Sequence, residues 1–201
     1  MANKAEQTIT VGVARLSYAN LFKPVARNPQ DDPKYSTTIL IPKNDVRSKQ
    51  LMDMAIEAAK QTGLMDQFQG AIPPILATPV YDGDGVRPSD GLPFGAECKG
   101  HWVFTASAQA TNPPGVVDKS RNKITDHSEV YSGIYALASI NFYAYHASGK
   151  KGIGIGINNV MKISDGPSLA GKKSANEDFS DIDVSGFEEV EIDPITGEPV
   201  L

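Results

Sequence analysis

Cysteine, long apolar runs and a signal segment are scarce or missing in this chain of 201 residues, and each absence removes a class of protein. Cys98 is the one cysteine, so no internal disulfide can form and a reducing compartment is expected. One cysteine and three scattered histidines make no recognisable zinc signature. No apolar run spans a membrane, and the N-terminal MANKAEQ lacks the apolar segment of a signal peptide. We therefore expect a cytoplasmic protein that contacts no membrane.

The common catalytic motifs are also missing. The sequence contains no GxxxxGK[ST] phosphate loop, no GxSxG, no HExxH and no CxxC. The acidic residues of the body are dispersed, and DGDG at 82–85 lacks the spacing and closing Glu of a calcium loop. We therefore expect no enzyme, no cofactor and no metal. A small metal-dependent nuclease stays an alternative, and its acids would be Asp82, Asp84, Asp90 and Glu97.

Basic residues are absent from the last 25 positions. Residues 177–201 contain nine acids and no Lys or Arg, although the whole chain has a formal net charge of −5. The remaining 176 residues therefore hold 19 bases and 15 acids (24 minus 9), a net charge of about +4. The chain is a mildly basic body with an acidic tail. Since the tail has few large apolar residues, we expect it to be disordered.

What the sequence does contain is a long β-hairpin pattern at 130–163. From Ile134 to Ala144, aliphatic residues alternate with polar residues and tyrosines, and side chains two apart share one face of a strand. From 152 to 157, three isoleucines alternate with three glycines. A glycine row weakens a strand, and close approach by another chain or a ligand is a good reason to keep it. The two strands are expected to join at Ser148–Gly149.

The rest of the chain favours a small β-barrel with one helix. Strands are predicted at 7–18, 34–41 and 100–110, with a loop at 20–33 and a long Pro- and Gly-rich loop at 67–97. A helix is predicted from an Asn44 or Asp45 cap to Thr62, before Gly63. About five strands and one helix match a mainly β, partly open five-stranded barrel of the OB type with long loops.

Such barrels bind single strands through stacking aromatics and a basic groove. Three classes of candidate contact follow from strand alternation and charge. Bases would stack on Tyr135, Tyr143 and Tyr145; phosphates would meet Lys34, Lys99, Arg121, Lys123, Lys150 and Lys151; and the backbone would approach closely at Gly152, Gly154 and Gly156. Ordinary surface residues are the alternative for each tyrosine and lysine taken singly.

The acidic tail has two interpretations. It is either a solubilising end or a segment that competes for the DNA groove and docks on basic patches of partner proteins. The tail residues expected to anchor a partner are Asp178, Phe179, Asp181, Phe187 and Leu201.

The run PPGVVDKSRNKITDHSEVYSGIYALASINFYAYHASGKKGIGIGINNVMKISDGPSLAG and the later NEDFSD resemble the bacteriophage OB-fold single-stranded DNA-binding proteins, long catalogued as a domain of unknown function. The early strand, the following FKP and the segment KYSTTILIPK match as well, so the resemblance covers residues 7–173. It implies an OB barrel without catalytic activity that coats single-stranded DNA in phage replication, recombination or repair. It also implies a C-terminal tail that contacts phage replication or recombination proteins, and a location in the host bacterial cytoplasm.

The resulting prediction is an OB-fold single-stranded DNA-binding domain at residues 5–168, followed by a linker and acidic tail at 169–201. A phage structural or assembly protein and an RNA-binding module are further alternatives, because both would share the β-rich pattern. A homodimer is left open.

Overall fold

The computed structural model describes residues 4–26, 28–147, 149–169 and 182. The chain divides into two units, and the helices and strands belong to the first, Met1–Ala170. The predicted tail anchors Asp178, Phe179, Asp181, Phe187 and Leu201 lie outside the described residues, as does Ser148 of the predicted hairpin turn.

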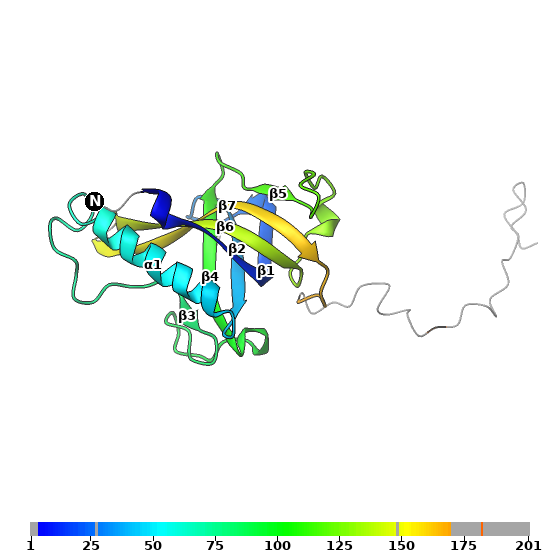
Figure 1. The fold of residues 1–201 in the computed structure, drawn as a ribbon, viewed down its shortest axis with the longest axis horizontal. Coiled ribbons are helices and arrows are strands. Elements are labelled where there is room, and N and C mark those ends of the chain that lie inside the picture. Colours follow the sequence, from blue (N-terminus) through cyan, green and yellow to red (C-terminus); the bar gives the residue numbers. More distant parts are fainter. Residues whose placement is uncertain (1–3, 27, 148, 170–181, 183–201) are drawn as a thin grey trace, which may run out of the picture. The chain divides into compact units, whose positions relative to one another are not determined.

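The described body is mainly β, as the sequence predicts (Figure 1). Its elements follow in the order η1 (Lys4–Gln7), β1 (Thr8–Val25), β2 (Lys34–Pro42), α1 (Val46–Thr62), β3 (Tyr81–Asp82), η2 (Ala96–Cys98), β4 (His101–Gln109), β5 (Gly115–Val117), η3 (His127–Glu129), β6 (Tyr135–Ala147) and β7 (Lys150–Ser164).

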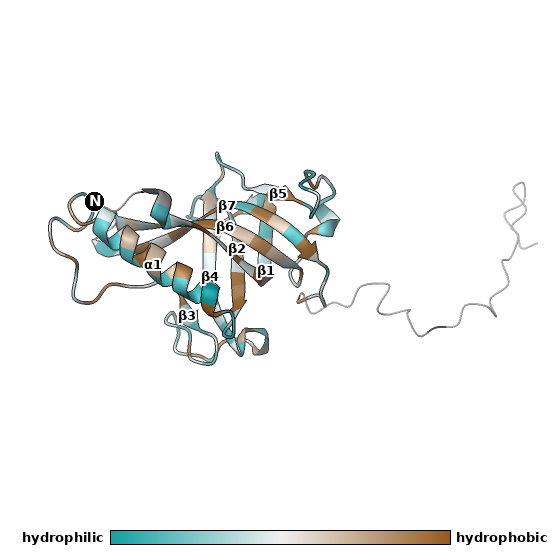
Figure 2. Ribbon diagram, in the orientation of Figure 1, coloured by the Kyte–Doolittle hydropathy of each residue, from teal (hydrophilic) through white to brown (hydrophobic). Residues whose placement is uncertain are grey.

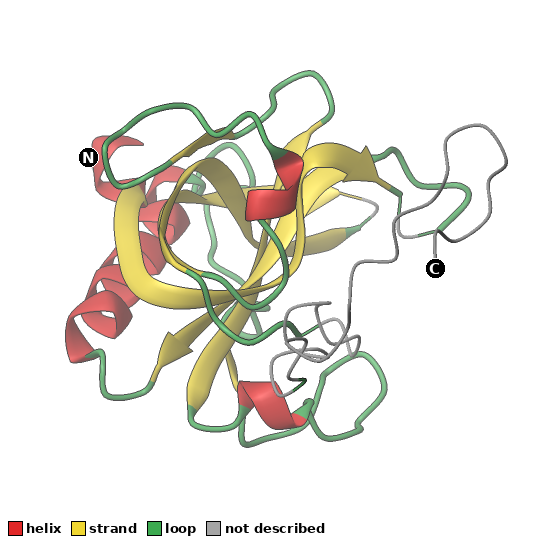
Figure 3. Cartoon of the chain, turned by 90° about the vertical axis from the view of Figure 1, so that its right-hand side faces the viewer, coloured by secondary structure: helices red, strands yellow, loops and turns green. Residues whose placement is uncertain are grey.

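Five long strands close into a barrel, which Figure 3 shows nearly end-on. The strand order is β3-β4-β2-β1-β6-β7-β5, and the sheet closes where β4 and β7 pair in parallel at Ser107 and Gly156. β1, β2, β4, β6 and β7 thus form the ring, while β3 and β5 are short additions at its edges. This is the five-stranded barrel of the OB-fold, so the predicted fold class is confirmed.

β1 is long because it serves both halves of the barrel. Its first part, Thr8 to Arg15, pairs with β6, and its second part, Arg15 to Val25, pairs with β2. The β1–β6 register shifts between Val11 and Ala14, at Gly12, whose φ is 113° and where a Cβ would lie 2.7 Å from the carbonyl oxygen of Ala136. A glycine is required there, since other residues rarely adopt this conformation.

The prediction of a loop from residue 20 is wrong for its first part, because β1 continues to Val25. The β1–β2 register shifts between Ser17 and Asn20 and again between Asn20 and Val25. These irregularities break the two-residue alternation by which a strand is recognised in a sequence.

The aliphatic faces predicted for the hairpin form the centre of the core. Fully buried side chains are those of Ile134, just before β6, and of Ala136, Ala138, Ile140 and Phe142 on β6. Ile153, Ile155 and Ile157 of β7 are 2–4 % exposed. Figure 2 shows apolar residues along the barrel strands and alternating apolar and polar positions around α1. The core thus lies inside the barrel and under the helix.

The helix begins and ends where its capping residues predict. The Asp45 side chain accepts a hydrogen bond from the Ser48 N–H at 3.0 Å, and the helix ends at Gly63. A Cβ on Gly63 would overlap the Cβ of Ala144, so the glycine lets the helix end pack on β6. Figures 1 and 3 both show α1 along one side of the barrel. Among the described residues, no helix combines the length and apolar composition needed to cross a bilayer.

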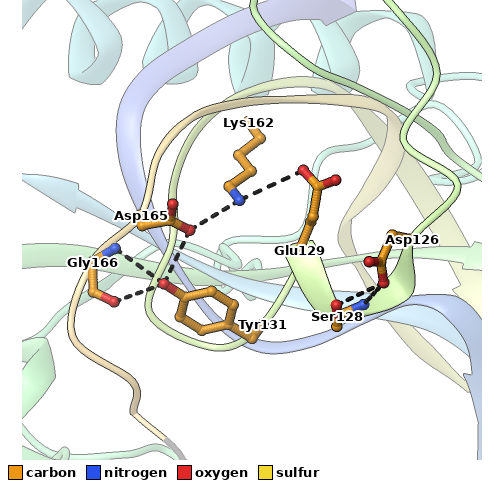
Figure 4. A network of polar contacts seen from close by, with 7 residues as sticks. All are labelled: Asp126, Ser128, Glu129, Tyr131, Lys162, Asp165 and Gly166. Atoms are coloured by element: carbon orange, nitrogen blue, oxygen red, sulfur yellow. Dashed lines mark hydrogen bonds and ion pairs between the residues drawn. The ribbon is translucent and has the colours of Figure 1, made fainter. Parts of the chain in front are cut away.

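The end of β7 is fixed to the body by a polar network (Figure 4). The Tyr131 hydroxyl donates to Asp165 at 3.1 Å and to the Gly166 carbonyl at 3.0 Å. Lys162 pairs with the same Asp165 at 2.9 Å and reaches Glu129 at 3.9 Å. The chain is therefore held against the barrel as it leaves β7.

Candidate nucleic-acid interface

A groove of about 720 Å³ runs over the outer face of β2 and β4. One wall is the connection between β1 and β2, a second is the segment 77–81, and a third is the β6–β7 hairpin. In OB-folds, this strand face and the loops between strands 1 and 2 and between strands 4 and 5 bind oligonucleotides. The groove therefore lies where the fold predicts a ligand.

The floor of the groove is open because its side chains are small and carry hydroxyl groups. Ser36 lies opposite Ser107, and Thr38 lies opposite Thr105, across the β2–β4 ladder. The two threonine hydroxyls are 3.1 Å apart. The alternate residues point inward, where Thr37, Ile39, Phe104 and Ala106 are buried. The sequence carries this signal in KYSTT and FTASAQ, but the prediction did not use it.

Two of the three predicted tyrosines stand together at the groove wall. Tyr143 is paired with Gly154, and Tyr145 is paired with Gly152, across the β6–β7 ladder. A Cβ on Gly154 would lie 2.6 Å from Cζ of Tyr143, and one on Gly152 would lie 2.6 Å from the Tyr145 hydroxyl oxygen. Each ring thus lies flat over the glycine opposite it. We call these two pairs the tyrosine platform.

Side chains of the protein itself therefore cover the glycine row. The close approach that the sequence predicts at Gly152 and Gly154 is made by the tyrosine rings of β6, and at Gly156 by the Asn141 side chain. Direct approach of a ligand backbone to these glycines stays a prediction.

Both tyrosines of the platform line the groove, and Tyr143 is the more exposed of the two. Tyr143 lines the groove and is 42 % exposed. Burial and then the neighbouring Tyr145 raise the pKa of Tyr143 above its ordinary value. Its hydroxyl is therefore uncharged at neutral pH and does not repel a phosphate.

Tyr135 lies elsewhere. Eight residues separate it from Tyr143 along β6, a distance of about 26 Å in an extended strand. Its ring lies 6.0 Å from the Arg15 guanidinium, and a Cβ on Gly166 would be 2.8 Å from its Cε2. Its stacking role stays a prediction, because the structure does not bring it to the groove lining.

The predicted phosphate contacts are scattered. Lys34 lines the groove, and Lys150 is exposed at the start of β7. Lys151 donates to the Phe68 carbonyl at 3.2 Å and so braces the loop after α1. Three further predicted bases are exposed but absent from the described groove lining: Lys99, Arg121 and Lys123.

Acidic residues also face the groove. Asp31 and Asp32 line it beside Lys34, so the described lining is not basic in net charge. The sequence prediction of a basic groove did not include these two aspartates, although they lie in the predicted loop before β2. Contacts of the six predicted bases with phosphate stay predictions.

Three of the four acids of the nuclease alternative are engaged in ion pairs. Lys43 contacts Asp82 at 2.5 Å and Asp84 at 2.6 Å, and Asp90 pairs with Arg87 at 2.9 Å. The hydrogen bonds from Lys43 hold the pKa of both Asp82 and Asp84 below the usual carboxyl value. In the part of the chain that the structure describes, no group of three or more His, Cys, Asp or Glu could hold a metal ion.

Known proteins match this chain over most of its length. The single-stranded DNA-binding protein from bacteriophage Enc34, solved in complex with ssDNA, is 25 % identical to this chain, with a TM-score of 0.67. The match covers 81 % of this chain and 89 % of the Enc34 chain. Protein p50 of Acyrthosiphon pisum secondary endosymbiont phage 1 is 24 % identical over 196 residues, 90 % of this chain and 97 % of that protein.

A more distant structure supports the fold. It is gp2.5, a single-stranded DNA binding protein encoded by bacteriophage T7, and it is 17 % identical with a TM-score of 0.57. The match covers 88 % of this chain and 100 % of the gp2.5 chain. The family model described as Enterobacter phage Enc34, ssDNA-binding protein matches residues 7–189. With a barrel, a groove and a match over nearly its whole length, this chain belongs to the family of the Enc34 ssDNA-binding protein.

Proposed function

We propose that this chain binds and protects single-stranded DNA without catalysis and without strong sequence preference. The observation that carries the proposal is the tyrosine platform, which presents an open aromatic face at the wall of the OB groove. Membership of the Enc34 family, and the similarity to a single-stranded DNA-binding protein in complex with ssDNA, support the same ligand.

The proposed contacts use residues that line or flank the groove. Bases stack on Tyr143 and Tyr145, while Lys34 and Lys150 neutralise phosphates. Stacking on an aromatic face is tolerant of sequence because every base has such a face, and it requires bases that are not hidden in a duplex. The hydroxyl-lined floor leaves room for the sugar and phosphate between the two walls.

The tail has a regulatory and docking role in this proposal. Residues 5–168 form the binding domain, and 169–201 form the linker and acidic tail. The nine acids of 177–201 compete with DNA for the groove and dock on phage replication, recombination or repair proteins. Removing residues 174–201 would then raise affinity for DNA and alter its salt dependence. If neither changes, the competition role is wrong.

The test is a titration with labelled oligo(dT), oligo(U) and a matched duplex at two salt concentrations. A label is preferable to Trp102 fluorescence, because Lys43 and Lys49 lie 5.3 and 5.0 Å from that ring's centroid and Trp102 is outside the groove lining. We expect tight, salt-sensitive binding to oligo(dT) and weak binding to the duplex.

Two variants make the titration specific to the platform. Tyr143→Ala should lower affinity about 5- to 150-fold, the range for one stacked base. Tyr135→Ala, on the same strand, tests the third predicted tyrosine: parent-like affinity would restrict base stacking to the platform, and a similar loss would assign a base contact to Tyr135 as well. If neither the full chain nor residues 1–173 bind any oligonucleotide, the DNA-binding proposal is wrong and an assembly protein becomes the better interpretation. Preference for oligo(U) would instead identify RNA as the ligand.

A further inference from the structure

A second cavity, of about 300 Å³, lies next to the groove. Tyr81 and Thr105 line both spaces, so the two cavities adjoin at these residues. Aromatic and apolar side chains dominate its walls. We call it the end pocket and define it by Tyr18, Tyr81, Arg87, Phe94, Glu97 and Cys98.

Tyr18 is the most unusual of these residues. It is 71 % exposed and has a φ of 50°, a left-handed conformation that a bulky residue rarely adopts. It lies at the first of the two register shifts between β1 and β2. Strained residues persist only where their surroundings hold them, and they are concentrated at binding sites.

The residues on both sides of Tyr18 are held in place. The Thr37 hydroxyl donates to the Ser17 carbonyl at 3.2 Å, and both residues are buried. The Ala19 N–H donates to the Ser132 hydroxyl at 3.3 Å. The bulge is therefore fixed from the barrel interior on one side and from the η3–β6 connection on the other, and it holds the Tyr18 ring outward.

Fixed aromatic side chains form another wall of the end pocket. The rings of Tyr81 and Phe94 are 6.4 Å apart between centroids and tilted by 33°. Phe94 packs against a small buried cluster of Leu40, Cys98 and Val103. A planar group that enters the pocket would thus find aromatic surface already in position, at little entropic cost.

The charges of the pocket do not suit a phosphate. The Arg87 guanidinium is paired with Asp90 through contacts of 2.9 and 3.2 Å. The Glu97 carboxylate accepts from the Cys98 thiol at 3.8 Å, and burial raises the pKa of that thiol to about 11, so it is uncharged at neutral pH. The described lining thus combines one guanidinium and one carboxylate, whose charges cancel, with hydroxyl and apolar side chains, which suits the edge of an uncharged base.

We propose that the end pocket receives one unstacked base of the same strand that lies on the tyrosine platform, with the Tyr18 ring on its face. This inference rests on the proposed function and adds a second, separate base site to it. The bound strand would then cross the hydroxyl floor between two aromatic sites.

The substitution Tyr18→Asn tests the site with the least damage to the fold. Asparagine tolerates a left-handed backbone, so the variant should fold at least as stably as the parent. It should bind oligo(dT) that spans both sites about 5- to 150-fold more weakly, whereas Tyr18→Phe should retain affinity. A strand of about four nucleotides, short enough for the platform alone, should bind the parent and Tyr18→Asn equally.

Photocrosslinking with 5-iododeoxyuridine placed at each position of an oligo(dT) gives an independent readout. We expect one set of cross-links at Tyr143 or Tyr145 and another at Tyr18 or Tyr81. Val13→Ala is the control, because Val13 is an exposed apolar residue on the same strand as Tyr18. It should change neither set of cross-links.

The base-binding role of the end pocket would be overturned if Tyr18→Asn bound the long oligo(dT) as the parent does, or if cross-links formed at the platform alone. Either result would leave the proposed function intact. Absence of binding by the parent would instead overturn the proposed function.

Discussion

The tyrosine platform and the end pocket both present tyrosine rings, but different structural features hold the rings in place. On the platform, the rings lie flat because the residues opposite them are glycines. At the end pocket, Tyr18 faces outward because its backbone is held in an unfavourable conformation. A missing side chain on the partner strand fixes the first site, and a distortion of its own strand fixes the second. Binding surfaces on one barrel can therefore be preorganised by either route.

The largest expected effect comes from removing the platform. The double variant Tyr143→Ala/Tyr145→Ala loses two stacking faces, so affinity for oligo(dT) should fall at least about 30-fold, from two stacks at the low end of the usual range. Fluorescence anisotropy with a labelled strand measures this, and a thermal melt checks that the protein is folded. A smaller loss than that of Tyr18→Asn would make the end pocket the principal site.

Gly154→Ala should break the platform without removing a ring. The added methyl group would meet Cζ, the hydroxyl oxygen and Cε2 of Tyr143 at 2.6–2.8 Å. These atoms are the outer end of a partly exposed side chain, so the ring should swing aside rather than the barrel unfold. We expect about a tenfold loss of affinity, equal to about 1.4 kcal/mol, with a nearly unchanged melting temperature.

Gly85→Ala is the control for that experiment. Its Cβ would meet the Asp82 carbonyl at 3.3 Å, and Gly85 does not line the groove. It should bind as the parent does. Parent-like affinity of Gly154→Ala would show that ring position is unimportant.

Two lysines near the platform should separate ligand contact from structural support. Lys34→Ala should reduce the slope of log affinity against log salt by about 0.7, the value for one phosphate of a single strand. Lys151→Ala should lower the melting temperature with an unchanged slope, because its ammonium holds the Phe68 carbonyl. If instead Lys151→Ala reduced the salt slope and Lys34→Ala lowered the melting temperature, Lys151 would be the phosphate contact and Lys34 the structural support.

The smallest effect concerns the loop that carries the end pocket. Asp82 and Asp84 have pKa values below the usual 3.8 because of their hydrogen bonds with Lys43. Their contribution to stability is therefore complete above that usual value and is lost as the pH falls through the lower, folded-state values. Below about pH 4, amide exchange should quicken at residues 81–100 more than in the β6–β7 hairpin, and only slightly, since the pairs are exposed.

Asp84→Asn should already show part of that faster exchange at neutral pH. Its carboxylate accepts from the Gly100 N–H at 2.9 Å as well as from Lys43. Equal exchange in the variant and the parent at both pH values would mean that the ion pairs do not support this loop.

The contrast between the two sites also explains how much the sequence could predict. The alternation of Ile153, Ile155 and Ile157 with glycines, and of the β6 aliphatics with tyrosines, predicts the hairpin, its core face and the platform residues, because the period of a regular strand is fixed. The caps of α1 are equally local signals, and the helix was predicted to within one residue at its start.

The remaining features depend on register and on contacts between distant segments. No residue pattern near Tyr18 indicates that β1 shifts register there. The sequence therefore did not predict the end of β1 or the end pocket. Tyr135 shares a strand face with Tyr143, yet strand length carries it away from the groove. Asp31 and Asp32 enter the groove only because the barrel brings the β1–β2 connection beside the hairpin.

The closing pair of the barrel has a consequence for how the protein holds its ligand. β4 and β7 are joined at Ser107 and Gly156, and the groove is lined by Ser107 from one strand and by Gly154 and Ile155 from the other. In the proposed mode of binding, a DNA strand in the groove lies across this seam and contacts both β4 and β7. Any opening of the seam would separate contacts that the ligand makes with both strands. Ligand binding and barrel closure would then favour each other: the bound nucleic acid would stabilise the closed barrel, and the closed barrel would bind the nucleic acid more tightly.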